Sequence, residues 1–193
     1  MRALGLIVLT LLGACAFSSE REFFTTRDGV QPFADGAHWI WAESGDSGER
    51  FELTFDLDDD GRYTVAPRSG QEPIPGVLFV PLSETPEEDY VVQVRLNQDN
   101  DAVLYAFLWR TGSGYRLVVD PGRLTADDDL SAADPYCEWQ SYQSCSISRR
   151  EDVFAIYRVL IHSRFVVGGE MPESYVDLLT PGAAVGRPSK DRK

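Results

Sequence analysis

Apolar and polar residues alternate along several short segments of the chain, and this alternation predicts a β-sheet. In FELTFDL at 51–57, the odd-numbered residues from Phe51 to Leu57 are apolar and the residues between them are polar. In YVVQVRL, the even-numbered residues from Tyr90 to Leu96 are apolar in the same way. A period of two residues is typical of a strand with one buried face.

Further segments of similar length are separated by turn-rich sequences. They predict strands at 38–42, 62–66, 76–82, 102–109 and 115–119. AVLYAFLW at 102–109 is apolar on both faces, as expected for a central strand or one that is covered on both sides. The pattern predicts an antiparallel meander of about seven to eight strands, and it leaves open whether the sheet closes into a barrel.

The period changes near residue 150, where the sequence predicts one helix. The apolar residues follow the i, i+3, i+4, i+7, i+8 spacing of a helix face and are Val153, Ile156, Tyr157, Leu160 and Ile161. Ser148 and Glu151 match a capping box, and Gly168-Gly169 predicts the end after about Val166. We therefore expect an α+β fold, mainly β, with one domain over 36–180 and this helix packed on the sheet.

Two sequence patterns bear on metal binding and catalysis. Asp56, Asp58, Asp60 and Gly61 match the start of a calcium loop, but its twelfth position is Pro67 where a bidentate Glu is needed. We therefore interpret DDDG at 58–61 as a hairpin turn.

His38 and His162 have no nucleophile motif beside them, and we predict no catalytic residue, metal ligand or cofactor. A cell-wall-directed enzyme stays open as the third hypothesis for the function.

The first fourteen residues resemble a bacterial secretion signal. Arg2 is followed by a short apolar run, which is too short to span a bilayer as a helix. Leu12-Gly13-Ala14-Cys15 resembles the lipobox of bacterial lipoproteins. That resemblance implies removal of residues 1–14 and acylation of Cys15. An ordinary signal with a chance cysteine is the alternative.

The resemblance also implies a location. Ala16 stands where an Asp would retain many lipoproteins in the inner membrane, so we expect a periplasm-facing outer-membrane protein anchored in the bilayer by Cys15. Residues 15–35 would form a lipidated N-terminus and tether with an entry strand. We expect the Pro/Gly-rich and then basic tail at 181–193 to be disordered.

Charge narrows the range of partners. The full chain has a formal charge of −13, and removal of residues 1–14, which contain one Arg and no acid, makes it −14. A chain this acidic is repelled by phosphate backbones, so we expect no nucleic-acid partner.

Export places the remaining cysteines in an oxidising compartment. With Cys15 acylated, Cys137 and Cys145 are left to form a disulfide; free thiols or half a metal site are the alternatives. Tyr136, Trp139 and Tyr142 lie in or beside this loop, either as a binding patch for an envelope protein or as packing residues.

The order of elements over about 50–155 also resembles a recurring type of small β-rich envelope protein of Gram-negative bacteria. The residues that carry this resemblance are Gly61-Arg62-Tyr63, VPL, YVVQV, LYAFLWR, GYRLVV and the cysteine pair with SCSISRRED. The resemblance implies a fold and no activity. Our leading hypothesis is a non-catalytic binding or assembly role, and the alternative is a small-ligand or lipid carrier with a lipocalin-like interior.

Overall fold

The structure is a computed structural model of the chain. It describes residues 17–44, 50–68, 70–82, 89–97, 100–119, 130–141, 144–172 and 175–181.

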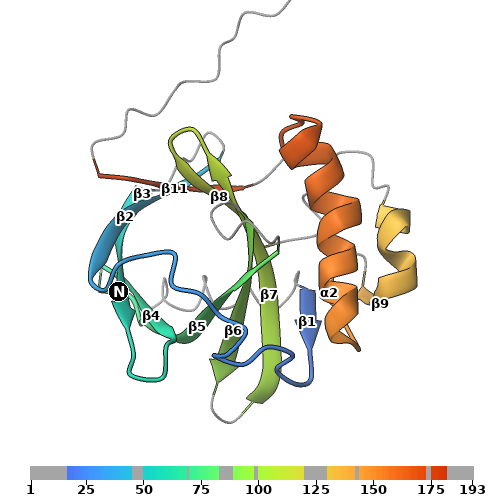
Figure 1. Cartoon of the computed structure of the whole chain (residues 1–193), viewed down its shortest axis with the longest axis horizontal. Coiled ribbons are helices and arrows are strands. Elements are labelled where there is room, and N and C mark those ends of the chain that lie inside the picture. Colours follow the sequence, from blue (N-terminus) through green and yellow to red (C-terminus); the bar gives the residue numbers. More distant parts are fainter. Residues whose placement is uncertain are drawn as a thin grey trace, which may run out of the picture.

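Eight antiparallel strands form a closed barrel (Figure 1). They are β2 (Ala37–Glu43), β3 (Arg50–Leu57), β4 (Tyr63–Pro67), β5 (Ile74–Pro81), β6 (Asp89–Asn97), β7 (Asn100–Thr111), β8 (Gly114–Val118) and β11 (Val176–Leu179). The ring closes because β6 pairs with β7 and β11 pairs with both β8 and β2. The predicted antiparallel meander is confirmed, and the sheet is a barrel.

Strand β11 was not predicted, although it closes the barrel. It has only four residues, and Val176 pairs with Glu43 on one side and with Leu117 on the other. A bidentate ion pair joins it to β8, with 2.8 Å from Arg116 Nε to Asp177 Oδ1. Because both side chains are mostly shielded from water, this pair holds β11 more firmly than an exposed ion pair would.

A second layer lies against the outer face of the barrel (Figure 1). It consists of β1 (Phe17–Ser19), β9 (Glu138–Ser141), β10 (Ser144–Ser146), the 3-10 helix η2 (Leu130–Tyr136), the α-helix α2 (Arg150–Ile156) and the π-helix η3 (Tyr157–Val167). β1 pairs with the first half of β7, whereas β8 pairs with the second half. β7 is therefore shared by the barrel and the outer layer.

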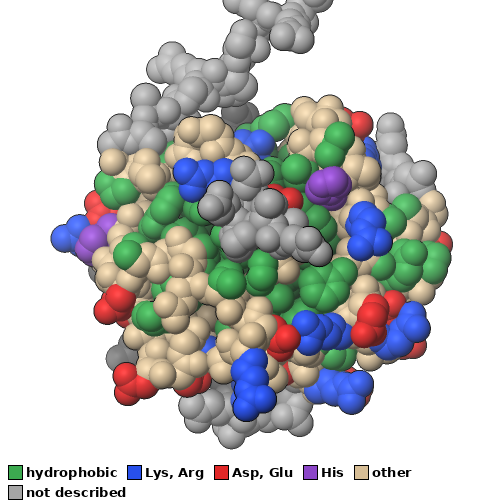
Figure 2. Space-filling model, in the orientation of Figure 1, with side chains coloured by type: hydrophobic (Ala, Val, Ile, Leu, Met, Phe, Trp, Pro, Cys, Tyr) green, Lys and Arg blue, Asp and Glu red, His purple; other side chains and the backbone are tan. Residues whose placement is uncertain are grey.

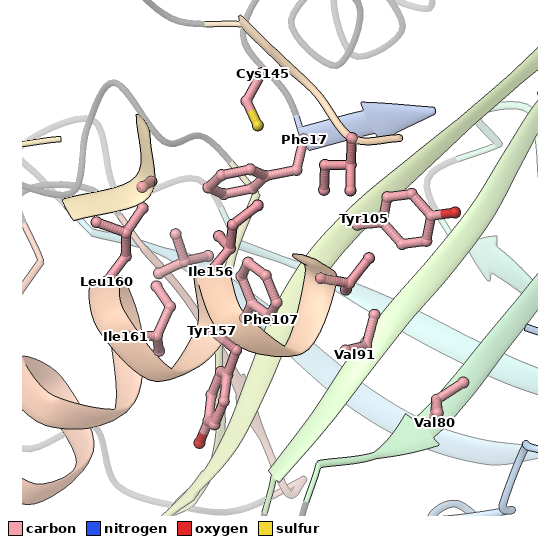
Figure 3. Close-up of a cluster of buried hydrophobic side chains, with 14 of the residues drawn as sticks. Phe17, Val80, Val91, Tyr105, Phe107, Cys145, Ile156, Tyr157, Leu160 and Ile161 are labelled. Carbon is pink, nitrogen blue, oxygen red and sulfur yellow. The ribbon is translucent and has the colours of Figure 1, made fainter. Parts of the chain in front are cut away.

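Two cores meet at β7, one on each face. Val103, Tyr105, Phe107 and Trp109 are buried against the helix, and the residues between them, such as Leu108, are buried inside the barrel. Figure 3 shows Phe107 among Phe17, Ile156 and Tyr157 in the outer core. The two-sided apolar pattern predicted this double coverage.

The helix begins one residue later than predicted, and the expected capping box is wrong. The N-cap is Arg149, and no side chain caps α2. Instead, the Arg149 guanidinium binds the carboxylate of Asp152 at 2.9 and 2.8 Å. Asp152 is thus the third residue of the helix, the position predicted for Glu151. Its negative charge is stabilised by the positive end of the helix dipole.

The five apolar residues predicted for the helix face are all buried. From Tyr157 to Val167, however, the helix is a π-helix, with hydrogen bonds between residues i and i+5. A spacing of four residues is close to one turn in both helix types, so the apolar pattern did not distinguish them. None of the helices in the described part of the chain is long and apolar enough to cross a membrane.

Residues 20–36 connect β1 to β2 and run across the barrel (Figure 1). The buried amide of Gln93 fixes this segment: its Oε1 accepts from Phe24 N at 3.1 Å, and its Nε2 donates to Phe24 O at 3.0 Å. Val30 N donates to Phe79 O on β5 at 2.8 Å. The segment expected to be a tether and entry strand thus contains β1 and packs on the barrel.

The burial of Tyr105 makes the stability of the fold depend on pH in the alkaline range. Burial is the main cause that raises the pKa of Tyr105 to about 12. Between pH 10 and 12 the unfolded chain loses this proton and the folded chain keeps it, so stability falls as pH rises. From pH 8 to pH 11 we expect the wild type to lose about 1.4 kcal/mol more free energy of unfolding than Tyr105→Phe. Urea unfolding at both pH values measures this difference, and equal losses would contradict it.

Candidate functional site

The interior of the barrel is the first candidate site, and a cluster of aromatic side chains packs there. Phe33 enters from the segment before β2 and is almost fully buried. Five rings surround it with centroids 4.3 to 6.3 Å away, and they belong to Trp39, Phe55, Tyr63, Phe79 and Tyr115. Tyr63 also donates a hydrogen bond to the Phe33 carbonyl, which fixes the ring-bearing loop.

Phe55 belongs to the face that the sequence predicted to be buried, whereas Phe33 was not identified as a core residue. Phe33 lies in a Gln-Pro-Phe-Ala stretch without a period. This side chain from a loop lies at the centre of the core only because the barrel closes around it. Phe33 thus lies at the centre of the aromatic cluster.

The cysteine loop is the second candidate site. Cys137 and Cys145 form a disulfide, with a Cα–Cα distance of 5.2 Å. Cys145 lies in β10 and is fully buried in the outer core, and Cys137 follows η2 directly. The bridge therefore joins η2 to the strand that pairs with β1.

The structure brings two of the three predicted aromatic residues to this loop. Tyr136 and Trp139 pack against the outer core but remain partly exposed. The indole nitrogen of Trp139 donates to Asp134 Oδ1 at 2.9 Å. Tyr142 lies outside the described residues. Tyr136 and Trp139 are thus each partly packed against the core and partly exposed.

Cys15 also lies outside the described residues, but the strand that follows it is described. Phe17 begins β1 and is fully buried. It pairs with Cys145 in the parallel direction and with Tyr105 in the antiparallel direction. The predicted lipid site is therefore two residues from a strand that is hydrogen-bonded on both sides.

The histidines do not form a common site. His38 is exposed on β2, where its Nδ1 lies 3.3 Å from Thr54 Oγ1. His162 is on η3, with its ring 5.8 Å from that of Tyr157. Within the described residues, no group of three His, Cys, Asp or Glu side chains could hold a metal ion.

The suggested calcium loop is a hairpin turn, as the sequence indicated. Gly61 has a φ of 84°, and its N–H donates to the carbonyl of Asp58 at 2.9 Å. Asp58 and its neighbours are exposed in the link between β3 and β4.

The sequence pattern does not predict the buried polar contact between Tyr157 and Asp89. The Tyr157 hydroxyl of η3 donates a hydrogen bond to Asp89, a buried residue at the start of β6. Burial and this carboxylate raise the pKa of Tyr157 well above its ordinary value. Asp89 ends an acidic run that looks like a solvated turn, so only the packing of the helix identifies it. The pair joins the helix to the barrel, and both residues are buried.

The disulfide should contribute measurably to stability. Replacing both cysteines, as Cys137→Ser with Cys145→Ser, should lower the free energy of unfolding by roughly 2.5 kcal/mol, because it reopens a nine-residue loop in the unfolded chain. Urea unfolding measures this. Cys145→Ser alone should cost more than Cys137→Ser alone, because it puts a hydroxyl into the fully buried position. Unchanged stability of the double variant would contradict the entropic argument.

Comparison of the chain with protein-family models, with curated proteins and with solved structures finds no match.

Proposed function

We propose that this chain is a lipid-anchored protein of the bacterial envelope, with a non-catalytic binding role carried by the outer surface of a filled barrel. The observation that supports this most directly is the packing around Phe33. A carrier needs an interior space that matches its ligand, because small-molecule sites bury most of the ligand in a preformed cavity. Here the described interior positions hold the chain's own aromatic rings.

The outer surface then remains for binding. Tyr136 and Trp139 on the cysteine loop are large, partly exposed aromatic side chains held by a disulfide. A rigid loop loses little conformational entropy when it binds, which favours such a loop as a contact surface. Figure 2 shows further apolar side chains reaching the surface on one face of the molecule, with basic and acidic groups around them.

The lipid anchor is supported by the sequence Leu12-Gly13-Ala14-Cys15 after a short apolar run. Two or more acyl chains hold a protein stably on a membrane. Ala16 favours the outer membrane over the inner membrane within the same proposal.

Cys15→Ser tests the anchor. We expect the variant to move from the membrane pellet to the soluble fraction of cell extracts, because it lacks the thiol that would be acylated. The double variant Cys137→Ser, Cys145→Ser is the matched control: it also removes cysteines but should stay in the pellet. Retention of Cys15→Ser in the membrane would contradict the proposal.

Phe33→Ala tests whether the barrel is filled. The wild type should give no saturable signal with a fluorescent fatty acid. Phe33→Ala should lose about 3–5 kcal/mol of stability, because a large buried side chain is removed. The cavity it leaves should take up a small apolar probe such as benzene, seen as a rise in melting temperature.

Phe154→Ala is the control for this experiment, since it removes a ring from the outer core and leaves the barrel interior unchanged. Stoichiometric binding of the fatty acid by the wild type would favour the carrier function, with Phe33 as a displaceable plug.

A further inference from the structure

The lipid site and the cysteine loop lie next to each other in the fold. Trp139 on β9 pairs with Cys145 on β10, Cys145 pairs with Phe17 on β1, and Phe17 pairs with Tyr105 on β7. Neighbouring strands are about 4.8 Å apart, so the backbone of Trp139 lies roughly 10 Å from that of Phe17. Phe17 and Trp139, which are 122 positions apart in the sequence, are thus in one row of the sheet.

The chain between Cys15 and this row is very short. Only Ala16 separates Cys15 from Phe17, and two residues span at most about 7 Å. Phe17 cannot follow the lipid outward, because it is hydrogen-bonded in the sheet and fully buried. If Cys15 carries the lipid, as proposed above, the lipid site is only two residues from β1, and the domain lies directly on the membrane surface.

The strand directions show which surface this is. β1 and β10 run parallel, so the N-terminal end of β1 lies beside the start of β10. Ser141, the last residue of β9, and Ser144, the first residue of β10, therefore lie on the N-terminal side of Phe17, from which Cys15 comes. The disulfide holds η2 against the same strand.

The side chains of this surface fit a lipid interface. Trp139 has an apolar ring with a polar N–H bonded to Asp134, and Tyr136 is likewise partly exposed. Trp and Tyr are enriched at membrane–water interfaces, where one end of the ring is in contact with lipid and the other with water. The formal charge of −14 without residues 1–14 and the exposed Asp134 and Glu138 disfavour anionic headgroups, which leaves zwitterionic phospholipid.

We infer that η2 and the strands β9 and β10 form a membrane-contacting surface, which binds the headgroup layer of zwitterionic phospholipid through Trp139. The inference rests on the proposed lipid anchor at Cys15. The membrane contact through Trp139 sets the orientation of the domain relative to the bilayer. β3 is four strands away from β7 in either direction around the eight-stranded barrel, so β3 faces away from the bilayer.

Tryptophan fluorescence tests this orientation. The probe is the full, acylated protein in phosphatidylethanolamine/phosphatidylcholine vesicles that contain a lipid with a nitroxide on its headgroup. The nitroxide should quench part of the wild-type emission, and Trp139→Phe should lose that quenched part. Trp41→Phe is the matched control and should keep it, because Trp41 lies on β2, next to β3 on the far wall.

A second measurement needs no substitution. On the same vesicles, amide hydrogen exchange should slow in peptides covering 130–146 and stay unchanged in peptides covering 50–57. The mass of the N-terminal peptide separates the two proposals. An unmodified Cys15 in membrane-bound protein contradicts the anchor and this inference with it. An acylated Cys15, with quenching that does not depend on Trp139 and no slowed exchange at 130–146, overturns the orientation and leaves the anchor standing.

Discussion

The fold depends on the burial of β7 on both faces. Its alternate residues enter two different cores, so each apolar side chain on the strand contributes about 1.5–3 kcal/mol on one side or the other. Because β7 is twelve residues long, it pairs with β6 along one edge and with both β1 and β8 along the other. The barrel and the outer layer are therefore one cooperative unit. A polar residue at Phe107 or Leu108 would disrupt one core and the wall between the two.

Much of the fold follows from local pattern, and the exceptions have a physical reason. The strands from β2 to β8 and the buried helix face were predicted, because each has a two-residue or helical period. β11 has four residues, too few for a period to be recognised, and β1, which lies in the segment expected to hold an entry strand, has only three. Their conformation is set by the open edges that the other strands offer. The N-cap was misplaced because Glu151 and Asp152 are adjacent, and only the side-chain contact with Arg149 distinguishes them.

The candidate site, too, could be predicted only in part from the sequence. The Cys137–Cys145 pair was predicted because cysteine chemistry leaves few choices, and the structure contains this disulfide. That Trp139 and Phe17 lie in one row was not predictable, because it depends on the parallel pairing of β1 with β10. Such a pairing joins distant segments without any signal in either. Phe33 was missed for a related reason, since a ring in a loop becomes central only when a barrel closes around it.

The proposed orientation also limits where a protein partner could bind. The helix and β1 cover the outer face near β7, and the bilayer would cover β9 and β10. The outer wall of β2 and β3 then remains, and its exposed side chains are polar, such as His38 beside Thr54 and Glu52 paired with Arg68. A polar, charged wall favours contacts guided by electrostatics, which tune specificity and association rate more than affinity. Binding of a partner at such a wall would weaken with salt.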